Sequence, residues 1–221
     1  MPKRWWFTAA PLFLLFASRL SLGGWAIVTV EQLPDHLVAG ESVTLQFMVR
    51  QHGVTPLKGL RPTLEARAGS NAVQAAAQPG RNYGQYLATL VVPEPGDWTV
   101  TINSGFGRSR LELLPIHAIR KGAALPATLV HAQQVRHLFV AKGCIGCHTR
   151  NEGGLRGGET IGPELTGKRY QADFLRRFLA DPSANPTRTG TFRMPNLGLQ
   201  PTEIGALVAF INSERTAARG M

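Results

Sequence analysis

The sequence is poor in cysteine, because Cys144 and Cys147 are the only two in 221 residues. Both lie in one short motif, so no disulfide can link distant parts of the chain. The folded parts must therefore be held together by apolar cores. The apolar fraction of 43% is ordinary for a globular protein and is consistent with such cores.

The N-terminus lacks an apolar run of the length that a membrane helix needs, which is about 20 residues. Its apolar stretch covers only residues 5–17 and follows Lys3 and Arg4. A short apolar stretch between basic residues and small residues, here around Gly23, is typical of a secretory signal. We therefore expect residues 1–23 to be a signal peptide, with an uncleaved N-terminal anchor as the alternative. Either case predicts a periplasmic or other extracytoplasmic protein, with membrane association as an option.

Signatures of several enzyme classes are also missing from the sequence. There is no phosphate-binding P-loop, no dinucleotide-binding glycine fingerprint, no nucleophile triad and no carboxylate pair placed for acid–base catalysis. A dense block of Lys and Arg is missing as well, although 24 Lys and Arg against 14 Asp and Glu give a net charge of +10. In an exported protein this charge favours an acidic partner surface or an anionic lipid, and we expect no nucleic acid partner.

Residues 24–116 have the pattern of short β-strands separated by turns. Between residues 42 and 50, apolar and polar side chains alternate, with Val43, Leu45, Phe47 and Val49 on one face and Thr44, Gln46, Met48 and Arg50 on the other. This alternation is typical of an antiparallel strand that buries one face. Six further runs of this kind, with Pro-Gly and other glycine turns between them, predict an all-β sandwich.

One part of this region has a recognisable pattern. Residues 83–100, "YGQYLATLVVPEPGDWTV", combine a strand, a Pro-Gly turn and a second strand that carries Trp98. This segment resembles the immunoglobulin-like β domains of the FixH, YtkA and CopC type, which occur in exported bacterial proteins. The resemblance implies an immunoglobulin-like sandwich over residues 24–116.

The pattern changes in the second half of the chain. Residues 117–129 contain Gly122, Pro126 and several alanines without periodicity, and we interpret them as a linker. Over residues 130–221 the apolar spacing becomes helical, which predicts an all-α domain. The three expected helices are one that ends at Gly143, one over residues 172–181 before Pro182, and one over residues 202–215 with Pro201 in its first turn.

The motif "CIGCH" contains Cys144, Cys147 and His148. A redox Cys-x-x-Cys pair normally begins a helix that follows a strand, whereas here a helix precedes the motif and a glycine-rich loop follows it. A structural zinc site needs four ligands, and the sequence has no second cysteine pair. Cys-x-x-Cys-His is the attachment signature of c-type haem. Two thiolates one helical turn apart add to the two vinyl groups, and the histidine reaches the iron, so we expect one covalent haem c.

A second axial ligand of the iron must come from the other haem face, and therefore from a loop well downstream of His148. Met1 would be lost with the signal, Met48 belongs to the β domain, and Met221 is the chain terminus. Met194 remains, and Pro195 after it predicts a non-helical segment. We therefore expect His148 and Met194 to be the axial iron ligands.

Residues 130–216 resemble a class I cytochrome c, with "CIGCH", "IGPEL" and "FRMPN" in order and a helix at each end. The resemblance implies that Pro163 accepts a hydrogen bond from the second ring nitrogen of His148, which would fix the ring orientation. It also implies that the first and last helices cross with Phe139 and Phe210 in contact.

Histidine and methionine together would leave no open position on the iron for oxygen or a substrate. The expected function is therefore the transfer of single electrons between partners of a respiratory or photosynthetic chain, without enzymatic activity of its own. The β domain would fix the cytochrome to a membrane complex. An alternative is a copper-handling or oxidase-assembly factor, in which His36, His52 and Met48 of the β domain bind copper. A third hypothesis, a haem peroxidase, would require that Met194 does not bind the iron.

The excess positive charge is larger in the second half of the chain. Residues 128–221 contain 12 Lys and Arg against 7 Asp and Glu, and residues 24–127 contain 9 against 7. Such a charge would steer a redox partner that has an acidic docking face. The basic residues that we expect near the haem edge are Lys142, Lys168, Arg169 and Arg193.

Overall fold

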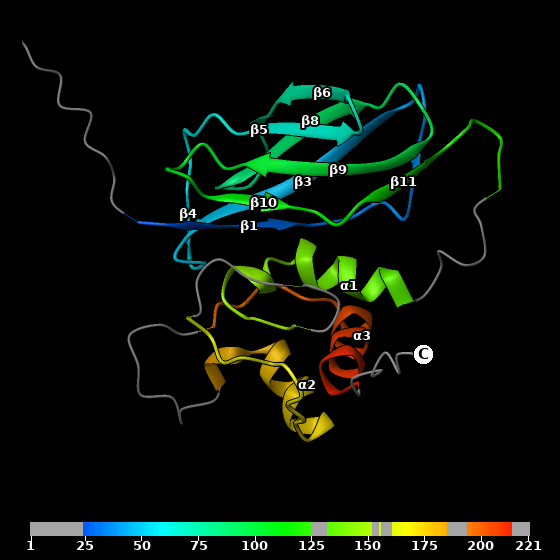
Figure 1. Ribbon diagram of the computed structural model, residues 1–221. Helices are drawn as coiled ribbons and strands as arrows, with labels where there is room; N and C mark the ends of the chain where they lie inside the picture. Colours follow the sequence, from blue (N-terminus) through cyan, green and yellow to red (C-terminus); the bar gives the residue numbers. More distant parts are fainter. Residues whose placement is uncertain (1–23, 125–131, 152–154, 156–160, 185–193, 214–221) are drawn as a thin grey trace, which may run out of the picture.

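The computed structural model describes residues 24–124, 132–151, 155, 161–184 and 194–213. The expected signal peptide, residues 1–23, lies outside the described residues. Within the described residues, a β domain is followed by a helical domain (Figure 1), which confirms the predicted fold class. In the same part of the chain, no helix has both the length and the apolar character needed to cross a bilayer.

The strands of the β domain form two sheets. The first has the strand order β1-β3-β8-β7, and β4 pairs with β3; the second has the order β2-β11-β9-β5-β6, and β10 pairs with β9. The strands of the first sheet are β1 (Ala26–Val30), β3 (Ser42–Gln51), β4 (Thr55–Pro56), β7 (Gln78–Pro79) and β8 (Gln85–Val91). Those of the second are β2 (Leu37–Val38), β5 (Thr63–Ala68), β6 (Asn71–Ala76), β9 (Gly96–Asn103), β10 (Arg110–Glu112) and β11 (Ile116–Ile119). All seven expected strands are present.

The core of the β domain lies between the two sheets. Trp98 is completely buried there, and its indole N–H donates a hydrogen bond to the carbonyl oxygen of Glu94 at 2.9 Å. Tyr86 is also buried, and its hydroxyl donates to the carbonyl oxygen of Leu57 at 2.8 Å. Because the indole N–H of Trp98 and the hydroxyl of Tyr86 both have an acceptor, these large side chains stabilise the core without leaving their own donors unsatisfied.

The strand β1 is buried on both of its faces. Val28 faces the core between the sheets, and Thr29, on the opposite face, is paired in register with Met48 of β3. Met48 is only 9% exposed, so our prediction that it lies on a polar, solvent-facing side was wrong. The alternation within one strand does not show how deeply each face of a sheet is buried.

The end of the β domain lies beyond the predicted boundary. The strand β11 continues to Ile119, three residues into the range 117–129 that we interpreted as a linker. It pairs antiparallel with β9 and parallel with β2. This short strand is buried on the core side at Ala118 and therefore belongs to the sheet.

The helical domain contains α1 (Ala132–Ala141), the 3-10 turn η2 (Cys144–Gly146), α2 (Ala172–Ala180), the 3-10 turn η4 (Pro182–Ala184) and α3 (Pro201–Asn212). The three helices predicted from the apolar spacing are thus present in the described residues. The helices α1 and α3 pack together through Phe139 and Phe210, whose ring centroids are 5.5 Å apart. At the start of α3, the backbone N–H of Gln200 donates to the Glu203 carboxylate at 2.9 Å, which stabilises the helix N-terminus.

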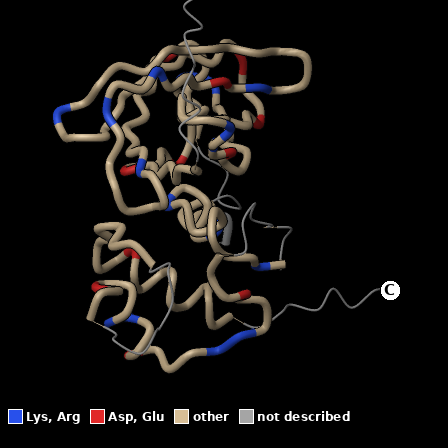
Figure 2. Tube along the Cα trace, turned by 90° about the vertical axis from the view of Figure 1, so that its left-hand side faces the viewer, with Lys and Arg blue, Asp and Glu red and all other residues tan. Residues whose placement is uncertain are grey.

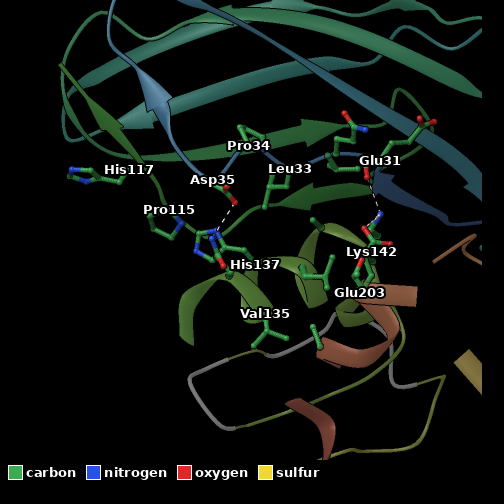
Figure 3. A pocket seen from close by; sticks show the side chains of 17 residues that line it. Glu31, Leu33, Pro34, Asp35, Pro115, His117, Val135, His137, Lys142 and Glu203 are labelled. Atoms are coloured by element: carbon green, nitrogen blue, oxygen red, sulfur yellow. Dashed lines mark hydrogen bonds and ion pairs between the residues drawn. The ribbon is translucent and has the colours of Figure 1, made fainter. Parts of the chain in front are cut away.

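The two domains meet along α1, directly below β1 in Figure 1. The ammonium group of Lys142 lies in this interface, where it donates to the carbonyl oxygen of Glu31 at 2.9 Å and forms an ion pair with Glu203 at 2.8 Å. Figure 3 shows this group on one side of an interdomain cavity of about 570 Å³. One lysine therefore joins the end of β1, the end of α1 and the start of α3.

Candidate haem site

A cavity of about 390 Å³ lies mainly within the helical domain. Its walls include all four predicted haem-binding side chains, which are Cys144, Cys147, His148 and Met194. Most of the remaining wall is apolar, and α2 contributes Phe174, Leu175, Phe178 and Leu179. A cavity with mainly apolar walls and a few convergent ligand side chains is the usual form of a cofactor site. The donor set and the surroundings therefore fit haem c.

The end of α1 places the cysteine motif. Gly143 follows the helix with φ = 72°, a left-handed conformation that ends a helix readily only for glycine. The chain then forms one tight turn, in which the backbone N–H of His148 donates to the carbonyl oxygen of Cys144 at 2.9 Å. This turn presents both thiols and the imidazole to the same cavity.

The imidazole of His148 is held by a backbone carbonyl. Its Nδ1 lies 2.9 Å from the carbonyl oxygen of Pro163. A carbonyl can only accept, so Nδ1 must carry the proton, and Nε2 keeps its lone pair for a metal. The geometry that the cytochrome resemblance implied for Pro163 is thus present in the structure.

Gly162 is a site residue that the sequence analysis did not single out. A Cβ at this position would lie 2.6 Å from His148 Nδ1, closer than real side chains approach, and 3.0 Å from the carbonyl oxygen of Cys147. Its backbone N–H donates to that same carbonyl oxygen at 2.8 Å. Only glycine lets this backbone pass directly beside the ring. In the sequence, this residue could be noticed only as the glycine directly before Pro163. The sequence alone gives no reason why a glycine is needed there.

Met194 lies in a segment without helix or strand, from residue 194 to the start of α3. This observation agrees with the expected loop. Met194 is partly buried and lines the same cavity as His148. Its role as an iron ligand remains a prediction.

Both cysteines are partly buried. Loss of solvent raises the pKa of the Cys144 thiol to about 12 and is also the cause of a raised pKa at Cys147. Redox-active Cys-x-x-Cys motifs have the opposite property, a lowered thiol pKa that makes one sulfur a ready thiolate. The surroundings of this pair therefore argue against a dithiol redox centre.

The β domain forms part of the cavity wall, which sequence reasoning missed. Trp25, Ile27 and His52 all line the cavity. The Trp25 and His52 rings are in contact, with centroids 5.3 Å apart. A Cβ on Gly146, inside the cysteine motif, would collide with Ile27 Cδ1, so β1 packs directly on the motif. These residues are far from the motif in sequence and left no local pattern to detect.

A buried arginine supports the motif from the side of α3. Arg150 is only 2% exposed. Its Nη1 donates to the carbonyl oxygen of Ile211 at 2.9 Å, and its Nη2 donates to Ser213 Oγ at 3.0 Å. The guanidinium carbon also lies 4.3 Å from the ring centroid of Phe210. A cation at the C-terminal end of α3 is favoured by the helix dipole, and here it ties the motif to that helix.

The predicted docking charges need one correction. Lys142 is 8% exposed and bound to Glu31 and Glu203, so it cannot steer a partner from the surface. Lys168 and Arg169 are exposed, and Arg193 lies outside the described residues. Figure 2 shows that basic residues occur in both domains and do not form one block.

The β-domain residues proposed as copper ligands do not form a recognisable site. Within the described ranges, no group of three or more His, Cys, Asp and Glu is placed to hold a metal ion. His52 faces the haem cavity, and Met48 is in the middle of β3. The structure offers no observation in favour of a copper centre.

The comparison with protein families gives a match in the helical domain only. Residues 132–214 match the family model of cytochrome c. The C-terminal region is a cytochrome c domain. Cytochrome c domains carry a covalently bound haem c, and this domain therefore supports a haem-based electron-transfer function. The β domain lies outside the matched residues.

Comparisons with whole proteins are less informative. No curated protein matches the chain. Among solved structures, an alpha-2-macroglobulin from Escherichia coli is 18% identical with a TM-score of 0.35, over 42% of this chain and 6% of that protein. A superoxide reductase (neelaredoxin) from Ignicoccus hospitalis is 16% identical with a TM-score of 0.30, over 46% of this chain and 86% of that one. Similarities this weak carry no argument about function.

Proposed function

We propose that this chain is an exported cytochrome with a single haem c. It carries electrons one at a time between partners of a respiratory or photosynthetic chain, as a subunit or docking partner of a membrane complex. The observation that carries the proposal is that His148 and Met194 line one largely apolar cavity beside Cys144 and Cys147. Haem c, when bound, supplies a one-electron iron couple.

The residues of the chain have distinct tasks in this function. The two cysteines anchor the cofactor, and the carbonyl of Pro163 holds the His148 ring with its proton on Nδ1. The thioether of Met194 is a soft ligand that favours reduced iron and so raises the reduction potential. The apolar side chains of α2 exclude water, which also favours the state of lower charge.

The test is to produce the chain from residue 24 onward with a c-type haem maturation system. We expect haem that stays on the polypeptide after denaturation, at one per chain, and a reversible one-electron titration at a potential above that of bis-histidine haems. Cys144→Ala and Cys147→Ala should each reduce the amount of stably attached haem. Haem that is released completely on denaturation of the unaltered chain would refute the proposal.

For the remaining parts of the chain, we propose that residues 1–23 are a signal peptide and that the β domain is immunoglobulin-like, of the FixH, YtkA and CopC type. The presence of two sheets around a core with a buried Trp98 supports this type. Export is tested by expressing the full chain and locating it by cell fractionation. N-terminal sequencing of the mature protein would show a start near residue 24 if the signal is cleaved, and Met1 if it is retained as an anchor.

A further inference from the structure

The turn between β3 and β4 lies on the side of the β domain that faces the helical domain (Figure 1). The backbone N–H of Val54 donates to the carbonyl oxygen of Gln51 at 3.0 Å, and the two residues between them both have positive φ, 53° at His52 and 76° at Gly53. This is the pattern of a tight hairpin turn with two left-handed residues, in which the first position is usually Asn, Asp or Gly. A histidine in this conformation is strained, and such strain is often kept where a side chain must be aimed at a site.

His52 is exposed and lies at the wall of the haem cavity. It lines the cavity together with Trp25, and the two rings touch. The backbone N–H of His52 also donates to the carbonyl oxygen of Trp25 at 3.1 Å. The turn is thus tied to the residue that precedes β1, and the pair forms one unit of the cavity wall.

The second residue of the turn contacts the segment that carries Met194. A Cβ placed on Gly53 would lie 3.1 Å from Cγ of Pro195, the residue directly after Met194. This distance is short enough that the neighbour would have to shift by a few tenths of an ångström. The turn therefore sits against the proline with no space for a side chain between them.

The Met194 segment lacks the backbone hydrogen bonds of a helix or a strand. It has neither helix nor strand from residue 194 to the start of α3. No backbone ladder therefore fixes the position of the thioether. A rigid surface from another element can supply the restraint, because a positioned ligand competes better for a metal than a loosely held one.

We propose that the turn formed by Gln51, His52, Gly53 and Val54 is a clamp that holds the Pro195 ring and thereby keeps Met194 in the haem cavity. This inference rests on the proposed function, in which Met194 is an iron ligand. The clamp gives the β domain a role at the haem itself, in addition to any role in docking. Its residues are positioning residues that act through Met194 and do not bind the iron.

The experiment uses the haem-loaded protein, with residues 24–221, and the substitution Gly53→Ala. Alanine at this position pushes on the proline and should loosen Met194. The matched control is Gly59→Ala, because Gly59 has nearly the same backbone φ of 72° but nothing within 4 Å of its Cβ position. Both variants therefore carry similar backbone strain, and only one presses on Pro195.

The readouts are the near-infrared sulfur-to-iron charge-transfer band and the affinity of the ferric protein for added imidazole, which competes with a methionine ligand. We expect Gly53→Ala to weaken the band and to bind imidazole at least about tenfold more tightly than the wild type, because loss of about 1.4 kcal/mol of restraint corresponds to a factor of ten. Gly59→Ala should stay within about twofold of the wild type, since a surface change away from the site has little effect.

A second variant pair tests the contact itself. Pro195→Ala removes Cγ, the atom that the new methyl group would meet. In that background, adding Gly53→Ala should change imidazole affinity no more than Gly59→Ala does. This loss of effect is the coupling that a double-mutant cycle measures for residues in contact.

The outcomes separate the clamp from the proposed function. If the wild type has the sulfur-to-iron band but Gly53→Ala and Gly59→Ala bind imidazole equally, the clamp is refuted and the proposed function stands. If Gly53→Ala has the same effect with and without the Pro195 ring, the clamp is also refuted. A wild-type protein without the band would refute both, because Met194 would then not be a ligand.

Discussion

At the scale of single residues, His148 is positioned by Gly162 and Pro163, which lie together in the loop that follows the cysteine motif. The Pro163 carbonyl determines which ring nitrogen carries the proton, and Gly162 leaves room for the ring. Neither residue would bind the cofactor directly. Both determine whether Nε2 of His148 points into the cavity with a free lone pair.

Gly162→Ala should therefore disturb the histidine. The added methyl group would lie 2.6 Å from Nδ1, so either the ring or the loop must move. Overpacking of this kind costs about 1–3 kcal/mol of stability. Thermal unfolding and the yield of haem-loaded protein measure the effect, and we expect both to fall. Gly205→Ala, in α3 with nothing near its Cβ position, is the control; an equal effect of the two changes would contradict the account.

At the scale of secondary structure elements, much was predictable from the sequence, because strands and helices leave a period in the apolar residues. The alternation in β3 and the helical spacing in α1, α2 and α3 gave those elements nearly at their observed bounds. The errors have a common cause. Met48 and Lys142 are both buried by contacts outside their own element, and Lys142 contacts Glu31 across 111 positions of the chain. Contacts between residues so far apart leave no pattern in either segment.

The residues of the candidate site also fall into those that the sequence indicated and those that it did not. Cys144, Cys147 and His148 are close in sequence and form a motif whose spacing reflects its chemistry. Met194 could be found because few methionines exist in the chain. Trp25 and His52 could not be found, since their part in the site depends entirely on how β1 and the β3–β4 turn pack on the helical domain.

Arg150 links the cysteine motif to α3, so Arg150→Gln should lower the stability of the protein. Glutamine cannot reach both Ile211 and Ser213 with the geometry of a guanidinium group, and it lacks the charge that the end of α3 favours. Hydrogen bonds to charged groups contribute about 1.5–3 kcal/mol each, so we expect a decrease of about 2–4 kcal/mol in the free energy of unfolding. Denaturant unfolding measures it. A change below about 0.5 kcal/mol, the range of ordinary surface substitutions, would show that the arginine is dispensable.

His137, in the helix α1, should make the stability of the protein depend on pH. Burial, and secondarily the charge of Arg136, lowers the pKa of His137 below its usual 6.5. The unfolded chain then binds a proton more readily than the folded chain. The contribution of His137 to the free energy of unfolding is complete above pH 6.5. It is lost as the pH falls from there through the folded-state pKa of His137. His137→Gln should reduce the loss of stability between pH 7 and pH 5. An unchanged pH profile in chemical unfolding would contradict this role.

At the scale of the whole molecule, residues of both domains line one cavity. The cavity wall contains residues of both domains, and the buried Lys142 binds Glu31 of one domain and Glu203 of the other. The β domain thus covers one side of this cavity, and we expect a redox partner to approach from the surfaces that it leaves accessible. From residue 24 onward, 21 Lys and Arg against 14 Asp and Glu leave a net charge of +7, and we expect this charge to favour a partner with an acidic face.

Lys168 and Arg169 are the exposed charges of the cytochrome c domain that we expect to take part in this approach. The double change Lys168→Glu and Arg169→Glu should slow electron exchange with an acidic redox protein at low ionic strength and have little effect at high ionic strength, because salt screens exposed charges. Stopped-flow rates over a range of salt concentrations measure this. A rate that stays the same at low salt would mean that the partner docks elsewhere.

The most direct test of the central claim is the near-infrared sulfur-to-iron charge-transfer band of the ferric, haem-loaded protein, recorded for the wild type and for Met194→Ala. The account predicts that the wild type shows the band, that Met194→Ala loses it, and that only the variant binds carbon monoxide readily after reduction. If the wild type lacks the band and binds carbon monoxide, the iron is open on the Met194 side. That result would contradict electron transfer by a closed His148 and Met194 site.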